Sequence, residues 1–339
     1  MSPNYFVNAS AENFNIDPPS FSNIRPQCLH NNGVDLIILD GGHDDSSNST
    51  RSDAKVRGGN GKYVILWPKV HEGRLNMATA WMAYDLMLKD PSLSASERKE
   101  LQTMIRFSRH PGEKSFGEYE KSFGYYSSTQ GSIDSGVTNR KNRVNYMMQN
   151  HRSYDPSRPN NLSSSYENVT SNTVMISVHA NSSDYYNEGD VTWVIPPKGT
   201  STSSKTYQLL SQIRKGMSRH FGSFYTPESN DDRTIASLKD KVYPTVAESR
   251  ILGKEHSVNL AMLSSTLGNS NTVKLLLEGF VMNGNAGDIA NREITKSSRP
   301  MKLNFDRSGR SVISYDVSNV YLSYAKSIVQ GISDRYGCK

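Results

Sequence analysis

Short runs of apolar residues recur along the chain and are separated by long polar stretches. The first lies at 34–39, reads VDLIIL and is closed by Asp40 and two glycines. A run of this kind is typical of a strand that is buried on both faces and ends in a tight turn. Further runs that predict strands lie at 63–67, 173–178, 191–195 and 273–277.

Other segments carry apolar residues at helical spacing. The clearest is 75–89, which consists of good helix formers with an apolar stripe and ends before Asp90 and Pro91. Similar patterns predict helices near 94–107 and over 204–220 and 318–332. Because strands alternate with helices, we predict an α/β fold with a single central, mostly parallel sheet flanked by helices.

The chain divides into an arm and one domain. Residues 1–33 are polar and rich in Asn and Pro, and we predict an irregular N-terminal arm there. Residues 34–339 form the domain, with a loop at 44–61. Residues 92–172 become rich in Gly, Tyr and Ser before the buried-strand pattern resumes, so we interpret them as a long insertion of unassigned role.

The composition restricts the class of protein. The 339 residues include 39 Lys and Arg against 33 Asp and Glu, a net charge of +6 that weakly favours polyanionic surroundings. This charge is spread over the chain, so we interpret the basic stretch near 139–144 as a solvated face and expect no nucleic-acid partner. No apolar run of about 18 residues occurs, so no membrane span is expected.

The two cysteines lie near opposite ends of the chain, at Cys28 and Cys338. Their spacing is not that of a metal site, and two cysteines so far apart in sequence do not indicate a disulfide framework. We therefore expect neither a disulfide framework nor a cysteine zinc site. Any metal would be held by histidine and carboxylate side chains.

Chemically capable side chains follow three of the predicted strands. His43 comes after a Gly-Gly turn, and His179 and Glu278 follow their strands directly. Ligand sites in α/β sheets gather beyond the carboxyl ends of the strands. Each residue alone is more often structural. Glu72, in the loop before the predicted helix at 75–89, is the natural third ligand beside His43 and His179. Two imidazoles and one carboxylate indicate a catalytic Zn²⁺ site with one open position. Glu278 suits the role of the base that takes a proton from water.

Four segments resemble, in chain order, the signature stretches of the zinc-dependent N-acetylmuramoyl-L-alanine amidases (amidase_3 type). They read LIILDGGHDD, HEGRLNMATAWMAYDLMLK, VMISVHANSS and VKLLLEGFVMN, and ISVHAN is the most specific match. The resemblance implies that His43, Glu72 and His179 are the zinc ligands and Glu278 the catalytic glutamate. It also implies that the amidase-like fold runs from about residue 34 to the end.

Two positions depart from the pattern of that family. Gly41 stands where the family usually has proline. Glu278 directly precedes Gly279 and Phe280, one residue closer than in the family. Because a one-residue slip in a strand reverses the side chain's face, either a bulge brings Glu278 to the site or its catalytic efficiency is reduced.

The reaction that the resemblance implies is hydrolysis of the amide between the lactyl group of N-acetylmuramic acid and L-alanine, which makes peptidoglycan the partner. Two alternatives remain. One is a zinc peptidase that cuts the stem peptide. The other is a non-catalytic wall-binding or tail structural protein that keeps the fold.

The opening residues lack the basic start and apolar stretch of a secretion signal. We therefore expect the chain to be made in the host cytoplasm and to reach the cell wall through a holin-type membrane lesion, by another export route, or as part of a virion. In this respect it resembles a bacteriophage endolysin or virion-associated lysin.

Overall fold

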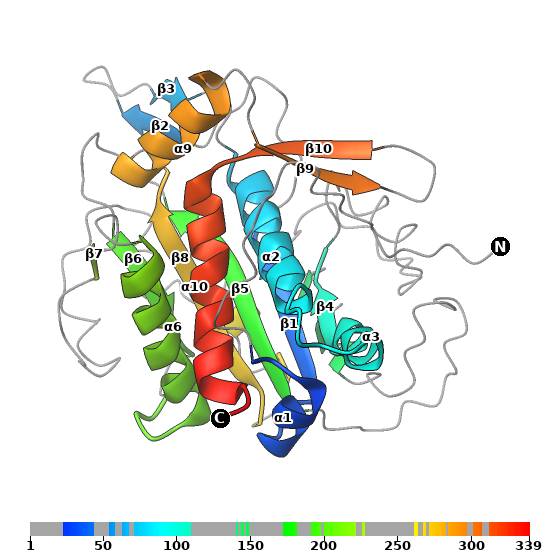
Figure 1. Ribbon diagram of the computed structural model, residues 1–339. Helices are drawn as coiled ribbons and strands as arrows, with labels where there is room; N and C mark the ends of the chain where they lie inside the picture. Colours follow the sequence, from blue (N-terminus) through cyan, green and yellow to red (C-terminus); the bar gives the residue numbers. More distant parts are fainter. Residues whose placement is uncertain are drawn as a thin grey trace, which may run out of the picture.

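A mixed sheet forms the centre of the computed structural model, with six strands in the order β4-β1-β5-β8-β6-β7 (Figure 1). Four strands run parallel: β1 (Leu36–Gly41), β4 (Ile105–Phe107), β5 (Thr173–Asn181) and β8 (Val273–Val281). β6 (Val191–Ile195) is antiparallel to β8, and β7 (Thr226–Pro227) pairs with β6 in parallel. The predicted α/β fold with a mostly parallel central sheet is confirmed.

The structure describes part of the chain. The described residues are 23–43, 54–57, 63–67, 71–109, 140–141, 144–145, 147–148, 172–181, 191–197, 200–221, 226–227, 261–263, 267–268, 271–282, 284–296, 301–306 and 312–339. Most of the predicted insertion, at 110–139 and 149–171, lies outside them, as do residues 1–22 of the predicted arm.

Three long helices cover one face of the sheet: α2 (Glu72–Leu88), α6 (Lys205–Phe221) and α10 (Asn319–Tyr336) (Figure 1). α10 packs against both of the others. The main core fills the space between these helices and alternate residues of β1, β5 and β8, among them Ile37, Ile176 and Leu275. Since α2 is enclosed by the sheet and its helical neighbours, it is buried nearly all round rather than along the single predicted stripe.

A smaller core lies on the opposite face of the sheet. Its members from β1 and β5 are the side chains that alternate with those of the main core, Leu36, Ile38 and Met175. They pack against described residues that follow in later segments: Val144, Met147, Met148, Met262 and Leu267. Both faces of β1 and β5 are therefore buried, as their continuous apolar sequence predicts.

Glycines allow α6 and α10 to approach closely. A Cβ on Gly216 would lie 2.5 Å from the Ser327 carbonyl oxygen, and one on Gly331 would lie 2.4 Å from Ile213 Cγ1.

None of the described helices is both long and apolar enough to cross a membrane.

The predicted loop at 44–61 is wrong in part. It contains β2 (Ala54–Arg57), which forms an antiparallel hairpin with β3 (Tyr63–Trp67) outside the central sheet. The strand predicted at 63–67 thus exists but takes no part in the main sheet. Its apolar sequence predicts a strand but does not specify which strand it pairs with. The helix predicted near 94–107 is α3 (Ala95–Met104), and its last three predicted residues instead form the edge strand β4.

Besides the two-residue β7, four elements of the second half were not predicted: η3 (Ala261–Leu263), α9 (Asn285–Lys296), β9 (Met301–Asp306) and β10 (Val312–Val317). The hairpin of β9 and β10 lies beside α2, and α9 follows β8 at the same end of the molecule (Figure 1). The buried apolar residues of α9 are few and mostly small, namely Ala286, Ala290 and Ile294, so this helix has fewer of the large apolar side chains that mark α2 and α10.

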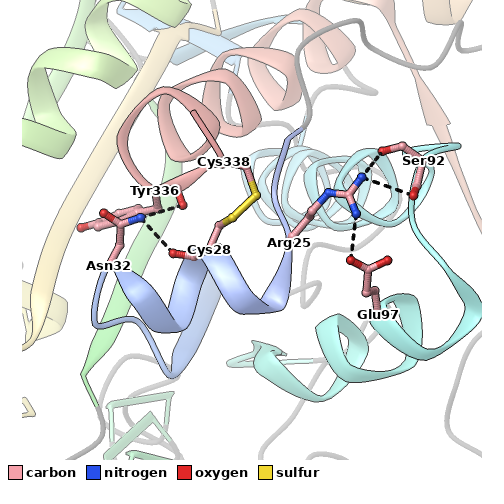
Figure 2. Close-up of a disulfide and its surroundings, with 7 residues drawn as sticks. All are labelled: Arg25, Cys28, Asn32, Ser92, Glu97, Tyr336 and Cys338. Atoms are coloured by element: carbon pink, nitrogen blue, oxygen red, sulfur yellow. Dashed lines mark hydrogen bonds and ion pairs between the residues drawn. A yellow bond between two sulfur atoms is a disulfide. The ribbon is translucent and has the colours of Figure 1, made fainter.

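A disulfide between Cys28 and Cys338 joins the two ends of the described chain (Figure 2). The expectation of no disulfide is therefore wrong, because residues 310 apart in sequence lie 5.3 Å apart between their Cα atoms. Cys28 lies in α1 (Pro26–Asn31), a short helix within the segment predicted to be irregular. The sequence separation of two cysteines does not reveal their distance in the fold.

Hydrogen bonds support the same junction. The Asn32 side-chain amide donates to the carbonyl oxygens of Cys28 and Tyr336, at 2.9 and 3.3 Å. On the other side of α1, Arg25 forms an ion pair of 2.9 Å with Glu97 of α3 and donates to the Ser92 hydroxyl (Figure 2). The described part of the arm is thus attached to both α10 and α3.

Replacing Cys28 with serine should lower the free energy of unfolding by about 2 to 5 kcal/mol, because the cross-link restricts the unfolded chain. Urea unfolding of Cys28→Ser and of the wild type, each with and without reductant, measures the effect. Reductant should destabilise the wild type alone. An unchanged wild-type midpoint under reductant would show that the bond contributes nothing.

Candidate functional site

The ends of β1, β5 and β8 and the beginning of α2 supply the candidate site residues. β1 ends at Gly41, two residues before His43. His179 lies near the end of β5, and Glu72 is the first residue of α2. Because parallel strands end at the same edge of a sheet, their last residues meet although the sequence separates them widely.

The structure brings His43, Glu72 and His179 together. Glu72 Oε2 lies 3.1 Å from His43 Nε2, and Glu72 Oε1 lies 3.0 Å from His179 Nδ1. The two imidazole rings are 5.1 Å apart and nearly perpendicular. One potential ligand atom from each of the three residues lies within 4.8 Å of the others. The three side chains could therefore hold a single metal ion.

The turn after β1 determines how these side chains fit together. A Cβ on Gly42 would lie 2.2 Å from His179 Cε1, so only glycine leaves room for that ring. His43 adopts a φ of 58°, which is uncommon for a residue other than glycine. The Asn76 side-chain amide donates to Glu72 Oε1 at 3.1 Å and to the Gly42 carbonyl oxygen at 3.3 Å. Asn76 thereby connects the turn to the glutamate one helical turn before it.

Electrostatics keep the glutamate charged. Burial by itself raises the pKa of Glu72, but the charge of His43 and the hydrogen bonds with His179 and His43 outweigh it and hold the pKa well below its usual range. Burial lowers the pKa of His179, against the opposing effect of its hydrogen bond with Glu72. At neutral pH this favours an anionic carboxylate beside a neutral imidazole, the forms that bind metal ions.

Glu278 lies on β8 directly across from His179 of β5. Immediately after this pair, two residues of β5 oppose three of β8, which is a bulge. Leu277 and Phe280 both belong to the main core, so alternation is interrupted between them, and Glu278 is directed to the other face. The structure thus contains a bulge, and it follows Glu278 in β8.

Glu278 does not belong to the group of three converging ligand atoms. Its side chain is buried, with 8% exposed. Burial raises the pKa of Tyr324 well above its usual value, and the charges of Glu278 and Glu72 add to the rise. Tyr324 donates from its hydroxyl to the His179 carbonyl oxygen at 3.0 Å. Tyr324 therefore connects α10 to the strand end that carries His179.

Sequence analysis missed a buried ion pair at the end of β1, three residues before His43. Asp40 Oδ1 accepts from Arg140 Nε at 2.8 Å, and both side chains are at most 2% exposed. The hydroxyls of Ser108 and Ser177 also donate to Asp40. Asp40 could have been suspected from its place at the end of an apolar run. Arg140 lay in the basic stretch that we predicted to be a solvated face, and that prediction is wrong for this residue.

Asp40→Asn should lower the free energy of unfolding at pH 7 by about 3 to 5 kcal/mol, because it leaves the buried Arg140 without a carboxylate. Burial raises the pKa of Asp40, but Arg140 and the two serine hydroxyls outweigh it and hold the pKa below its usual value. The stabilisation is thus complete above about pH 4, the unfolded pKa, and is lost as the pH falls through the folded one.

Urea unfolding across this pH range measures the difference. Asp288→Asn is a matched control, since its ion pair with Arg292 is at the surface and should contribute less than about 1 kcal/mol. A difference between Asp40→Asn and the wild type that stays constant down to pH 2 would contradict this account of Asp40.

No protein-family model matches the sequence, and no curated protein matches it. Solved structures with a similar fold include three amidases. The CwlD amidase from Clostridioides difficile, in complex with the GerS lipoprotein, has a TM-score of 0.40 at 12% identity, covering 89% of this chain and 98% of that one. The apo form of the N-acetylmuramyl-L-alanine amidase Ami1 from Mycobacterium abscessus has 0.37 at 13%, covering 88% and 97%.

The third is the N-acetylmuramoyl-L-alanine amidase AmiC2 of Nostoc punctiforme, with a TM-score of 0.35 at 12% identity, covering 88% of this chain and 94% of that one. These likenesses are distant in both sequence and geometry. We base the function of this chain on its own site residues.

Proposed function

We propose that this chain is a zinc-dependent N-acetylmuramoyl-L-alanine amidase that acts on peptidoglycan. The observation that carries the proposal is the convergence of His43, Glu72 and His179 from three distant segments of the chain. His43 and His179 were singled out by their place after predicted strands and Glu72 by its place before the predicted helix at 75–89, and all three by the resemblance of their motifs to that family. Convergence of all three is not expected if each residue were merely structural.

The donor set suits zinc. Two imidazole nitrogens and one carboxylate oxygen are ligands of catalytic Zn²⁺ sites, which keep a fourth position open. Atoms that bind one zinc at about 2.0 to 2.2 Å lie about 3.3 to 3.6 Å apart in a tetrahedral arrangement. Glu72 contacts His43 and His179 through its two different oxygens, at 3.1 and 3.0 Å, so both imidazoles lie next to the carboxylate that would share the ion with them. When bound, zinc supplies a Lewis acid that activates water and polarises a carbonyl group.

The remaining work falls to the protein's own groups. We assign to Glu278, which pairs with His179 in the sheet, the role of accepting a proton from the attacking water and delivering it to the leaving nitrogen. The bond that breaks is the amide between the lactyl carbonyl carbon and the nitrogen of L-alanine. Tyr324 and Asn76 hold the backbone at His179 and Gly42, which keeps the site residues in place during the reaction.

Two features support action at the cell wall. The disulfide between Cys28 and Cys338 is of a kind that persists in oxidising surroundings outside the cytoplasm. The net charge of +6 favours association with anionic wall polymers. Release through a membrane lesion, delivery within a virion and a bacteriophage source stay predictions.

The purified wild-type protein should contain about one zinc per chain, and His43→Ala and His179→Ala should each lose it, because three protein ligands are needed for tight binding. Metal analysis after dialysis measures this. His30→Ala is a matched control, since His30 lies in α1 beside Asp35 and Glu100, and it should retain the metal. Metal-free wild-type protein, or full retention in His179→Ala, would refute the centre.

Glu278→Gln should keep zinc but lower the rate of peptidoglycan hydrolysis by about 100-fold or more, because it removes the proton acceptor. Glu100→Gln, on exposed α3 surface, should leave the rate unchanged. The assay is release of soluble peptides from purified walls, with identification of the new amino termini.

The products distinguish the proposal from its rivals. An amidase releases peptides with a free N-terminal alanine. A zinc peptidase would instead expose termini within the stem peptide. A non-catalytic wall protein would bind the walls and release nothing.

A further inference from the structure

Two arginines are almost completely enclosed next to the candidate metal centre. Arg109 is 0% exposed and Arg140 is 2% exposed, and they are the largest fully buried side chains of the described residues. Enclosing a guanidinium group costs free energy unless its donors are hydrogen-bonded. The partners of these two groups therefore indicate what the burial achieves.

Arg109 connects the two segments that carry His43 and Glu72. Its Nε donates to the Gly41 carbonyl oxygen at 2.6 Å, two residues before His43. Its Nη2 donates to the carbonyl oxygen of Gly73, the residue after Glu72. A single side chain thus determines the separation between the end of β1 and the first turn of α2.

Arg140 connects the same turn to β5. Its Nε binds the Asp40 carboxylate at 2.8 Å, and its Nη1 donates to the His43 carbonyl oxygen at 3.4 Å. The other oxygen of Asp40 accepts from the hydroxyl of Ser177 at 2.5 Å, and Ser177 lies two residues before His179 in β5. Ser108, the neighbour of Arg109, also donates to Asp40, so the two arginines belong to one network.

We propose that Arg109 and Arg140 are positioning residues that fix the backbone segments of all three metal ligands. The network reaches the His43 carbonyl oxygen directly and residues within two positions of Glu72 and His179, but it uses none of the three ligand side chains. The proposal rests on the proposed function, because it concerns the geometry of the same centre. It also assigns a role to two residues of the segment at 92–172.

The chemistry of the guanidinium group explains why arginine stands at both positions. Its donors lie in a rigid planar fork, so one side chain can bind two acceptors in a fixed relation, which the single ammonium group of lysine cannot do. His43 has a φ of 58°, a left-handed conformation that is unfavourable for residues other than glycine. The bond from Arg140 to its carbonyl oxygen holds this unfavourable turn in place.

The experiment compares Arg109→Lys and Arg140→Lys with Arg106→Lys. Arg106 is a matched control: it is 9% exposed, lies on β4 close to Arg109 in sequence, and donates to the carbonyl oxygens of Gln102 and Ile105. Zinc affinity is measured on the full chain by competition with a chelator, and the ligand geometry by the visible absorption spectrum of the Co²⁺-loaded protein. Urea unfolding of the metal-free variants shows whether each is folded.

We expect both site variants to bind zinc about 10- to 100-fold more weakly than the wild type, the usual effect of removing a group that orients metal ligands. Their Co²⁺ spectra should be shifted. Arg106→Lys should match the wild type in affinity and spectrum, whatever its stability. Site variants that are folded and match the wild type in both readouts would overturn the proposal.

Ser177→Ala covers the case in which a lysine variant does not fold. It removes one hydrogen bond from Asp40 and should weaken zinc binding about threefold to tenfold. If the lysine variants are unfolded, wild-type zinc affinity in Ser177→Ala overturns the proposal. If the wild-type protein itself binds no zinc, the proposed function fails and this inference fails with it. Normal wild-type binding with unaffected variants sinks the inference alone.

Discussion

The Glu72 carboxylate lies between two imidazoles, and the surrounding structure is arranged to hold it there. Its two oxygens contact His43 and His179 at 3.1 and 3.0 Å, and Asn76 donates to one of them. A buried carboxylate is costly unless nearby cations or donors compensate for lost hydration. The contacts with the two imidazoles and the Asn76 amide must therefore offset the lost hydration of Glu72 for this edge of the sheet to be stable.

A second buried carboxylate, that of Asp40 at the end of β1, is also compensated by neighbouring groups. Asp40 is fully enclosed, and its charge is balanced by Arg140 and by two serine hydroxyls. Replacing such a group of charges by apolar side chains would often stabilise a protein, so its presence is weak evidence for a role in stability. Its position is more informative, because it connects the strand ends that carry His43 and His179 with the segment that carries Arg109.

The disulfide joins the two ends of the described chain at the end of the molecule away from the start of α2 (Figure 1). Cys338 follows α10, whose Tyr324 reaches the His179 carbonyl oxygen, and Cys28 lies in α1, which contacts α3. α3 leads into β4 and then to Ser108 and Arg109. The disulfide and the site are therefore connected through α10 and α3, so that holding the chain ends together also restrains two elements that support the metal ligands.

The sequence by itself determined the class of fold and the identity of the candidate ligands. Continuous apolar runs follow directly from strands buried on both faces, and His43, His179 and Glu278 could be found because ligands of such sheets follow strand ends. The predictions did not include the partner of β3, the edge strand β4, or α9, β9 and β10. The contact of Cys28 with Cys338, the bulge after Glu278 and the burial of Arg109 and Arg140 beside the site are visible in the fold alone. The physical reason is that these features depend on contacts between residues far apart in the chain, and no local spacing of residues encodes the distance between them.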